Sequence, residues 1–247
     1  MSRHPLVGCA GWNIPRDERA RFPEEGSHLE RFAARFTAVE INSSFYRPHR
    51  RTTYARWGES VPEGFRFSVK MPKAITHEQK LRGVESLLDP FLEECTGLGA
   101  KLGCLLVQLA PSFVFDLEVV GEFFEMLRER TDVTVACEPR HRSWSAMGAD
   151  DLLTTLRIAR VMADPLRVPG AEDPGGWTGT IYYRLHGSPR TYWSSYDDEF
   201  LETMAHRIEE DLADDRDVWC IFDNTAQGAA TTNGLWLLDR LAHGASE

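Results

Sequence analysis

The chain has 247 residues, of which 42% are hydrophobic and 27% are charged, and its formal net charge is -10. This length suits one α/β barrel domain or two smaller domains, and the composition is that of an ordinary soluble globular protein. The negative charge disfavours generic nucleic-acid binding, and no apolar run approaches the roughly 18 to 20 residues of a membrane span.

The N-terminal sequence MSRHPLVGCAGW has no long apolar segment followed by a small-residue cleavage site, so we do not expect a secretory signal. The cysteines are odd in number, widely spaced and mostly within apolar runs, which indicates reduced core thiols. We therefore expect a cytoplasmic protein without a disulfide framework or a zinc site. The five cysteines are Cys9, Cys95, Cys104, Cys137 and Cys220.

In chain order, eight short apolar strands are predicted, with helical patterns between most of them. The predicted strands are Leu6–Cys9, Ala38–Ile41, Arg66–Lys70, Cys104–Gln108, Val133–Glu138, Arg160–Ala163, Thr180–Leu185 and Val218–Phe222. The clearest helical patterns cover residues 27–36, 116–130, 198–213 and 227–243. Ser27 is a candidate N-cap for the first of these helices.

Eight strands that alternate with helices predict a parallel sheet, and eight is the number that closes a TIM (β/α)8 barrel. We expect a single barrel domain over residues 1–247, with a doubly wound open sheet as the alternative. The segment 165–179 is rich in Pro and Gly and cannot hold an ordinary helix. The sixth barrel helix is therefore expected to be reduced or absent.

Polar residues occur at the carboxyl ends of the predicted strands, where barrel active sites lie. Several are spaced by two and so share one face of their strand. These pairs are Glu40 with Asn42, Ser68 with Lys70, Glu138 with Arg140, and Arg184 with His186. The opposite face should contact the helices, and its predicted residues are Val39, Ile41, Val69, Val107, Val135 and Cys137.

A purely structural network of polar residues is the alternative interpretation. Each buried ion pair carries a desolvation cost of several kcal/mol, so a large cluster is a poor device for stability. A functional site near a solvated mouth should tolerate Glu138→Gln with a nearly unchanged melting temperature. Several charged residues gather at one end of the predicted barrel, which favours a functional site. They are Glu40, Lys70, Glu138, Asp164, Arg184 and His186.

Seven ordered motifs carry a family resemblance that covers nearly the whole chain. They are GCAGW, FTAVEINSSFYRPH, WGESVPEGFRFSVKMPKAITH, GCLLVQLAPSF, CEPRHRSW, YYRLHGS and FDNTAQGAA. Together they resemble the family called domain of unknown function 72, or YecE-like. The resemblance implies a TIM barrel and implies no established activity. Two positions depart from the family pattern: Ala110 replaces a proline, and Asp223 replaces an asparagine.

The favoured function is an enzyme that acts on a small phosphorylated or carboxylated substrate by acid/base chemistry. Glu40 or Glu138 would be the general base, and Lys70 a general acid or an electrostatic stabiliser. Schiff-base chemistry ranks lower, because it requires a neutral Lys70. The expected substrate-binding residues are Asn42, Tyr46, Gln108, Arg140, Arg184, His186, Asn224 and Thr225.

Two alternatives remain open from the sequence. The first is a metal-dependent hydrolase or isomerase, including phosphodiester cleavage, with Glu40, Glu138, Asp164 and His186 as the ligands. No cofactor is predicted in the favoured interpretation, because cations interspersed among these residues would repel a divalent metal. The second alternative is a non-catalytic protein that binds an anionic metabolite. A monomer or weak dimer is expected, although no residue pattern determines the oligomeric state.

Overall fold

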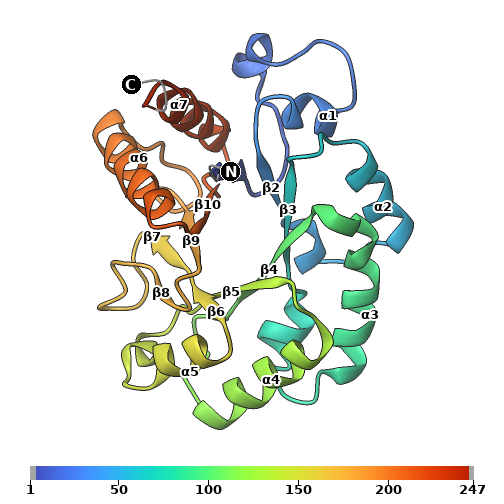
Figure 1. The fold of residues 1–247 in the computed structure, drawn as a ribbon, viewed down its shortest axis with the longest axis vertical. Coiled ribbons are helices and arrows are strands. Elements are labelled where there is room, and N and C mark those ends of the chain that lie inside the picture. Colours follow the sequence, from blue (N-terminus) through green and yellow to red (C-terminus); the bar gives the residue numbers. More distant parts are fainter. Residues whose placement is uncertain (1–3, 245–247) are drawn as a thin grey trace.

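A computed structural model describes residues 4–244 and shows an α/β protein in which strands and helices alternate. Figure 1 shows the α-helices on the outer side of the strands. The strands are β1 (Leu6–Cys9), β2 (Ala38–Ile41), β3 (Arg66–Lys70), β4 (Leu102–Gln108), β5 (Thr134–Glu138), β6 (Ile158–Arg160), β7 (Met162–Asp164), β8 (Gly175–Gly176), β9 (Thr180–Leu185) and β10 (Asp217–Phe222). The helices are α1 (His28–Ala33), α2 (Arg51–Glu59), α3 (Glu85–Cys95), α4 (Leu117–Arg130), α5 (Ala149–Thr155), α6 (Asp198–Ala213) and α7 (Ala229–Gly244).

The strands form two sheets. One has the order β1-β10-β9-β7, and the other has the order β2-β3-β4-β5-β6-β8. Every pairing is parallel except that of β8, which lies antiparallel to β6. The predicted α/β architecture of parallel strands and intervening helices is therefore confirmed, and the short strand β8 is an addition that the sequence did not indicate.

The two sheets approach each other at two places. Ala10 and Glu40 form an isolated parallel bridge, and the Gly11 amide donates to the Glu40 carbonyl at 2.9 Å. At the other place, Val161 alone separates β6 of one sheet from β7 of the other. The predicted strand Arg160–Ala163 is thus wrong in its bounds, because the chain changes sheets within it.

The segment between β7 and β9 contains no helix in the described structure. The prolines and glycines of this segment explain this, because they oppose continuous helical backbone. They are Pro165, Pro169, Gly170, Pro174, Gly175, Gly176 and Gly179. Loops and the two-residue strand β8 connect β7 to β9. The expected loss of the sixth helix agrees with this arrangement.

Two apolar clusters lie on opposite faces of the strands. The larger fills the space between strands and helices, and it includes all six residues predicted to face the helices. The smaller contains residues contributed by the strands, among them Cys104, Leu106, Tyr182 and Trp219. Because side chains alternate along a strand, the polar residues between the helix-facing positions must point to the inner side with this second cluster.

Side chains cap several helices where the sequence provides acidic or hydroxyl residues. Ser27 accepts from the Glu30 amide at 3.3 Å and Glu30 accepts from the Ser27 amide at 2.7 Å, which confirms Ser27 as an N-cap in a capping box. Asp116 and Asp197 are the N-caps of α4 and α6, and their side chains accept from the amides of Val119 and Phe200. In the part of the chain that is described, no helix combines the length and the apolar character required to traverse a lipid bilayer.

Gly8 allows β1 to approach β2 closely, since a Cβ atom there would lie 2.1 Å from the carbonyl oxygen of Ala38. Gly8→Ala should therefore force the two strands apart and destabilise the fold by about 2 to 3 kcal/mol, at the upper end of the usual cost of overpacking. Urea unfolding measures this loss.

Gly64→Ala is the matched control, because a Cβ atom there has no neighbour within 4 Å. The control should unfold like the parent protein. Equal stabilities for the two variants would show that the β1–β2 approach does not depend on Gly8.

Candidate functional site

Arg184 of β9 is the centre of a buried ion cluster at the carboxyl ends of the strands. Its side chain is fully buried. It binds both oxygens of Glu40 from β2, with Nε to Oε2 at 3.0 Å and one terminal nitrogen to Oε1 at 2.7 Å. The same guanidinium contacts Glu138 of β5 at 3.2 Å and Asp223, just after β10, at 3.0 Å. One arginine therefore connects carboxylates from three different strands.

His186 lies between two of these carboxylates. Nε2 is 3.0 Å from Glu138 Oε1, and Nδ1 is 3.0 Å from Asp223 Oδ2. Burial alone would lower the pKa of His186, but the charge of Glu138 and the hydrogen bond to Asp223 raise it above its usual value. The geometry thus favours an imidazolium that donates from both nitrogens.

Glu138 has no free capacity for a reacting proton. Besides Arg184 and His186, it accepts from Gln108 Nε2 at 2.9 Å. Burial would raise the pKa of Glu138, yet Arg184 and His186 hold this pKa well below its ordinary range. Such a carboxylate is a weak base.

Glu40 is occupied in a similar way. Its carboxylate accepts from Arg184 and from the hydroxyl of Tyr182 at 3.1 Å, and the Tyr182 oxygen in turn accepts from the Ser68 hydroxyl at 2.9 Å. Glu40 and Glu138 therefore accept several buried hydrogen bonds each, and Arg184 and His186 direct most of their donors at carboxylates.

Lys70 at the end of β3 differs from these residues. It is only 5% exposed, and its Nζ makes no hydrogen bond and no ion pair within residues 4–244. Nζ lies 4.3 Å from the centre of the Phe45 ring. Burial and then the charge of Arg184 lower the pKa of Lys70 to about 8, although the nearby carboxylates act in the opposite direction.

Arg140 and His77 lie beside Lys70. Arg140 Nε is 3.7 Å from Glu138 Oε1, too far for a hydrogen bond, and it has no partner within the described residues. His77 packs edge-on against Phe45, with ring centres 4.9 Å apart. Burial and the charges of Lys70 and Arg140 lower the pKa of His77, which keeps it neutral near pH 7. Phe45 is therefore the common neighbour of an amine and an imidazole.

The charges in this region do not balance. Three carboxylates, Glu40, Glu138 and Asp223, face four cationic groups, Arg184, protonated His186, Lys70 and Arg140. The three carboxylates, Arg184 and His186 contact one another, and we call these five residues the saturated network. An excess of positive charge is left at Lys70 and Arg140.

Other predicted residues lie outside this cluster or are engaged elsewhere. Asp164 accepts from the Tyr196 hydroxyl at 2.7 Å, and Asn224 donates to the Ser194 carbonyl and to Asn233. Tyr46 is 69% exposed and packs edge-on against Phe45. Thr225 is also exposed. Asn42 is half-buried, with an Oδ1 atom that has no partner among the described side chains.

The four expected metal ligands are not arranged as a ready site. Across residues 4–244, no group of three or more His, Cys, Asp or Glu side chains could hold a metal ion. Asp164 accepts a hydrogen bond from Tyr196, and Glu40 and Glu138 accept hydrogen bonds from Arg184. The residues as arranged therefore do not fit a divalent cation.

Sequence reasoning gave no role to four residues of this region: Asp223, Tyr182, His77 and Phe45. Asp223 departs from the family pattern, and the available signal was its position directly after the apolar strand and two residues from the inward-facing Ile221. Tyr182 shares strand parity with Arg184 and could have been found from that spacing. His77 and Phe45 lie in short helical segments, Ala74–Glu78 and Ser43–Phe45, which contain too few residues for a periodicity to indicate which way a side chain points.

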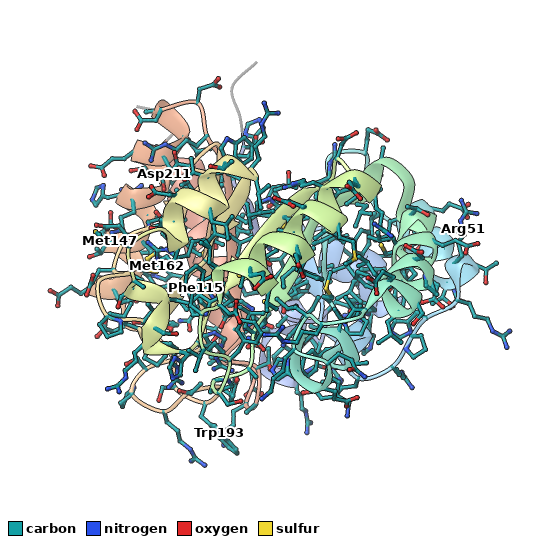
Figure 2. The ribbon with its side chains drawn as sticks, turned by 90° about the horizontal axis from the view of Figure 1, so that it is seen from below. Arg51, Phe115, Met147, Met162, Trp193 and Asp211 are labelled. Atoms are coloured by element: carbon teal, nitrogen blue, oxygen red, sulfur yellow. The ribbon has the colours of Figure 1, made fainter. Side chains whose placement is uncertain are left out.

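The loop after β9 covers the cluster from one side. Tyr192 packs edge-on against His186 with ring centres 5.6 Å apart, and its carbonyl accepts from the Ala226 amide at 3.0 Å. Figure 2 places Trp193 of this loop at the end of the molecule opposite Asp211. This is the end at which β9 and β10 finish. The loop thus packs against the outer side of the His186 ring.

A separate groove of about 330 Å³ lies next to the cluster, between the turns that follow β2 and β3 and helix α3. Its lining is mainly apolar and includes Phe45, Pro72, Ile75 and Phe91. The groove does not contain the ion cluster, and Phe45 is the residue that both share. Charged groups with shifted pKa values converge at the cluster and not in the groove.

Comparison with known proteins identifies similar chains. A family model described as "Protein of unknown function DUF72" matches residues 6–247. UPF0759 protein YecE of Escherichia coli K12 is 28% identical over 59% of this chain, and the matched part is 52% of that relative. The chain thus spans about half the length of that relative. UPF0759 protein YunF of Bacillus subtilis 168 is 24% identical over 95% of this chain and 94% of its own.

A crystal structure of a DUF72 family protein from Enterococcus faecalis V583 is also similar. It has a TM-score of 0.80 at 20% identity, and the alignment covers 97% of this chain and 96% of that chain. At this identity the likeness concerns the fold alone.

Glu138→Gln should destabilise the protein strongly. The substitution removes one charge from a fully buried network and takes a charged hydrogen-bond acceptor away from Arg184 and His186. The expected loss is about 3 to 5 kcal/mol, which lowers the melting temperature by on the order of 10 °C. This replaces the expectation that the melting temperature stays unchanged, because Glu138 is fully buried.

Glu202→Gln provides the control for that measurement. Glu202 pairs with Arg240 at 2.7 Å on the surface, where ion pairs contribute about 0 to 1 kcal/mol. Thermal unfolding of both variants separates the two cases. Equally small shifts would mean that the buried network contributes no more than a surface pair.

The raised pKa of His186 predicts a pH dependence of stability. A group whose folded pKa exceeds its unfolded value stabilises fully below the unfolded value, and this contribution disappears as pH rises through the folded pKa. Relative to His186→Gln, the native protein should therefore lose free energy of unfolding as the pH rises above about 6.5.

Urea unfolding at a series of pH values tests this expectation. The lowered pKa of Lys70 gives a contribution of opposite sign, but it is present in both proteins and cancels in their difference. Parallel stability curves from about pH 5 to about pH 9 would show that His186 is not held as a cation.

Proposed function

The chain belongs to the DUF72 family, whose activity is not established, and we propose that it is an enzyme for a small anionic substrate bound at the ion cluster. The observation that carries this proposal is the pair of cations, Lys70 and Arg140, that lack a strong carboxylate partner. The surrounding carboxylates are already saturated by Arg184 and His186. A phosphate or carboxylate group of a substrate would supply the missing negative charge.

The saturated network supports this role by holding the two cations in place. Arg184 and its three carboxylates stay fixed when a ligand enters, because each of their contacts is made within the protein. A charge that is positioned in advance stabilises a developing negative charge without reorganising first. Lys70 and Arg140 are therefore the binding groups, and Glu40 and Glu138 act by positioning them.

Acid/base chemistry in this proposal uses Lys70 and His77. A neutral imidazole can accept a proton, and a lysine with a pKa near 8 can donate one at neutral pH. Both groups contact the same aromatic ring, that of Phe45. His77 takes the role of base that the sequence suggested for Glu40 or Glu138, and Lys70 keeps its suggested role of general acid.

We also propose that the two sheets are parts of one TIM (β/α)8 barrel that forms a single domain. The bridge between Ala10 and Glu40 and the direct passage from β6 to β7 support this architecture. In a barrel, the carboxyl ends of the strands form the mouth at which active sites lie. An experimental structure with a solvent-filled gap between β1 and β2 would contradict it.

The metal-dependent alternative and the non-catalytic alternative remain distinguishable by one screen. Phosphorylated and carboxylated metabolites are incubated with the protein, with added Mg²⁺ or Mn²⁺ or with EDTA, and products are detected by mass spectrometry. Turnover that persists in EDTA is the expected result. Turnover that needs the metal would support the hydrolase or isomerase alternative, and binding without any product would support a metabolite sensor.

Arg140→Gln should weaken the binding of inorganic phosphate and of malonate about 10- to 100-fold, because a charge-assisted hydrogen bond is lost. The melting temperature should change little, since Arg140 is not part of the saturated network. Titration calorimetry at low and high salt measures the effect, and the affinity of the parent protein should fall as salt rises.

Arg142→Gln is the matched control. Arg142 is an exposed arginine on the same loop after β5, so its loss removes the same charge from the surface. Equal affinities of Arg140→Gln and the parent protein for both anions would place the anion elsewhere.

A further inference from the structure

Lys70 is unlike the other lysines of this protein. The sequence contains four, Lys70, Lys73, Lys80 and Lys101. Lys73 pairs with Glu78 at 3.0 Å, Lys101 donates to the Pro62 carbonyl, and Lys80 is exposed. Within the described chain, Lys70 is the lysine that is buried and that forms no ion pair. Its amine is therefore available for chemistry in a way that the others are not.

The surroundings of Lys70 explain why this amine stays unpaired. Glu40, Glu138 and Asp223 are near enough to influence it, but Arg184 and His186 occupy their oxygens. Arg184 also adds a second positive charge close to the ammonium. A lysine that is desolvated and lies next to another cation is the usual form of an activated amine nucleophile.

We propose that Lys70 forms an imine with the carbonyl carbon of an anionic aldehyde or ketone, while Arg140 binds the anionic group of that substrate. This inference rests on the proposed function, because it uses the same anion site. It adds the chemical class of the substrate and a covalent step, which the proposed acid/base role does not include.

The bonds and protons of this step balance without an oxidant or a reductant. The lone pair of the neutral amine forms a C–N bond, and the carbonyl electron pair moves to oxygen. His77 takes a proton from the nitrogen and returns it to that oxygen, which gives a carbinolamine. The C–O bond then breaks, water leaves with a second proton from nitrogen, and a C=N bond remains. Amine and carbonyl become imine and water.

The neutral amine that this step needs is populated near neutral pH. With a pKa of about 8, roughly a tenth of the Lys70 side chains are neutral at pH 7, against about one in three thousand for an ordinary lysine. Arginine could replace the charge of Lys70 but not its reactivity, since a guanidinium does not lose its proton in proteins. The protein carries lysine at this position, although most of its basic residues are arginine.

Reductive trapping tests the proposal. The full chain is incubated with glyoxylate or with pyridoxal 5′-phosphate, two anionic aldehydes of different size, and then treated with sodium borohydride. Peptide mass spectrometry identifies the modified amine. We expect one modification per chain at Lys70, at least tenfold above Lys73, Lys80 and Lys101, and suppressed by inorganic phosphate. Lys70→Arg should abolish it, Lys73→Arg should leave it unchanged, and His77→Gln should slow it about tenfold or more.

Separate measurement of phosphate binding distinguishes the two proposals. If phosphate binds but neither aldehyde modifies Lys70 above the surface lysines, the imine proposal is overturned and the anion site stands. If phosphate does not bind, the proposed function fails, and this inference fails with it. An unchanged trapping rate in His77→Gln would remove His77 from the proton transfer.

Discussion

The buried guanidinium of Arg184 is the interaction on which the rest of the site depends. It forms ion pairs with carboxylates from β2, from β5 and from the segment after β10, which are distant from one another in the sequence. Buried charges of this kind are costly unless every donor and acceptor is used. Here the guanidinium, His186, Gln108 and Tyr182 satisfy the carboxylates together, so the cluster is rigid and has no spare capacity of its own.

That saturation separates two tasks within one group of charged residues. The carboxylates and Arg184 maintain geometry, while Lys70, Arg140 and His77 at the edge of the cluster have protons or charge to offer. Phe45 holds Lys70 and His77 next to each other without competing for their polar atoms. The proposed chemistry is therefore assigned to the groups with the fewest partners rather than to the hydrogen-bonded carboxylates.

Strand periodicity was sufficient to predict the alternation of elements, the helix-facing residues such as Val69, and the inward direction of Glu40, Lys70, Glu138 and Arg184. Periodicity describes direction but not pairing, so it could not show that Arg184 would contact three carboxylates. For the same reason it suggested a base at Glu138, where saturation leaves none. His77 and Phe45 were not predicted, because they lie in helical segments of five and three residues, which are too short to show a periodicity. The division of one expected strand at Val161 likewise depends on which sheet each half joins.

The distribution of this network along the chain has a consequence for folding during synthesis. Glu40 and Glu138 are made well before Arg184, and Asp223 follows still later. Until β9 has left the ribosome, a compact intermediate would have to bury two carboxylates without their main counterion. Early compaction of the N-terminal half is therefore energetically unfavourable. The two carboxylates can be buried with their counterion once nearly the whole polypeptide has been synthesised.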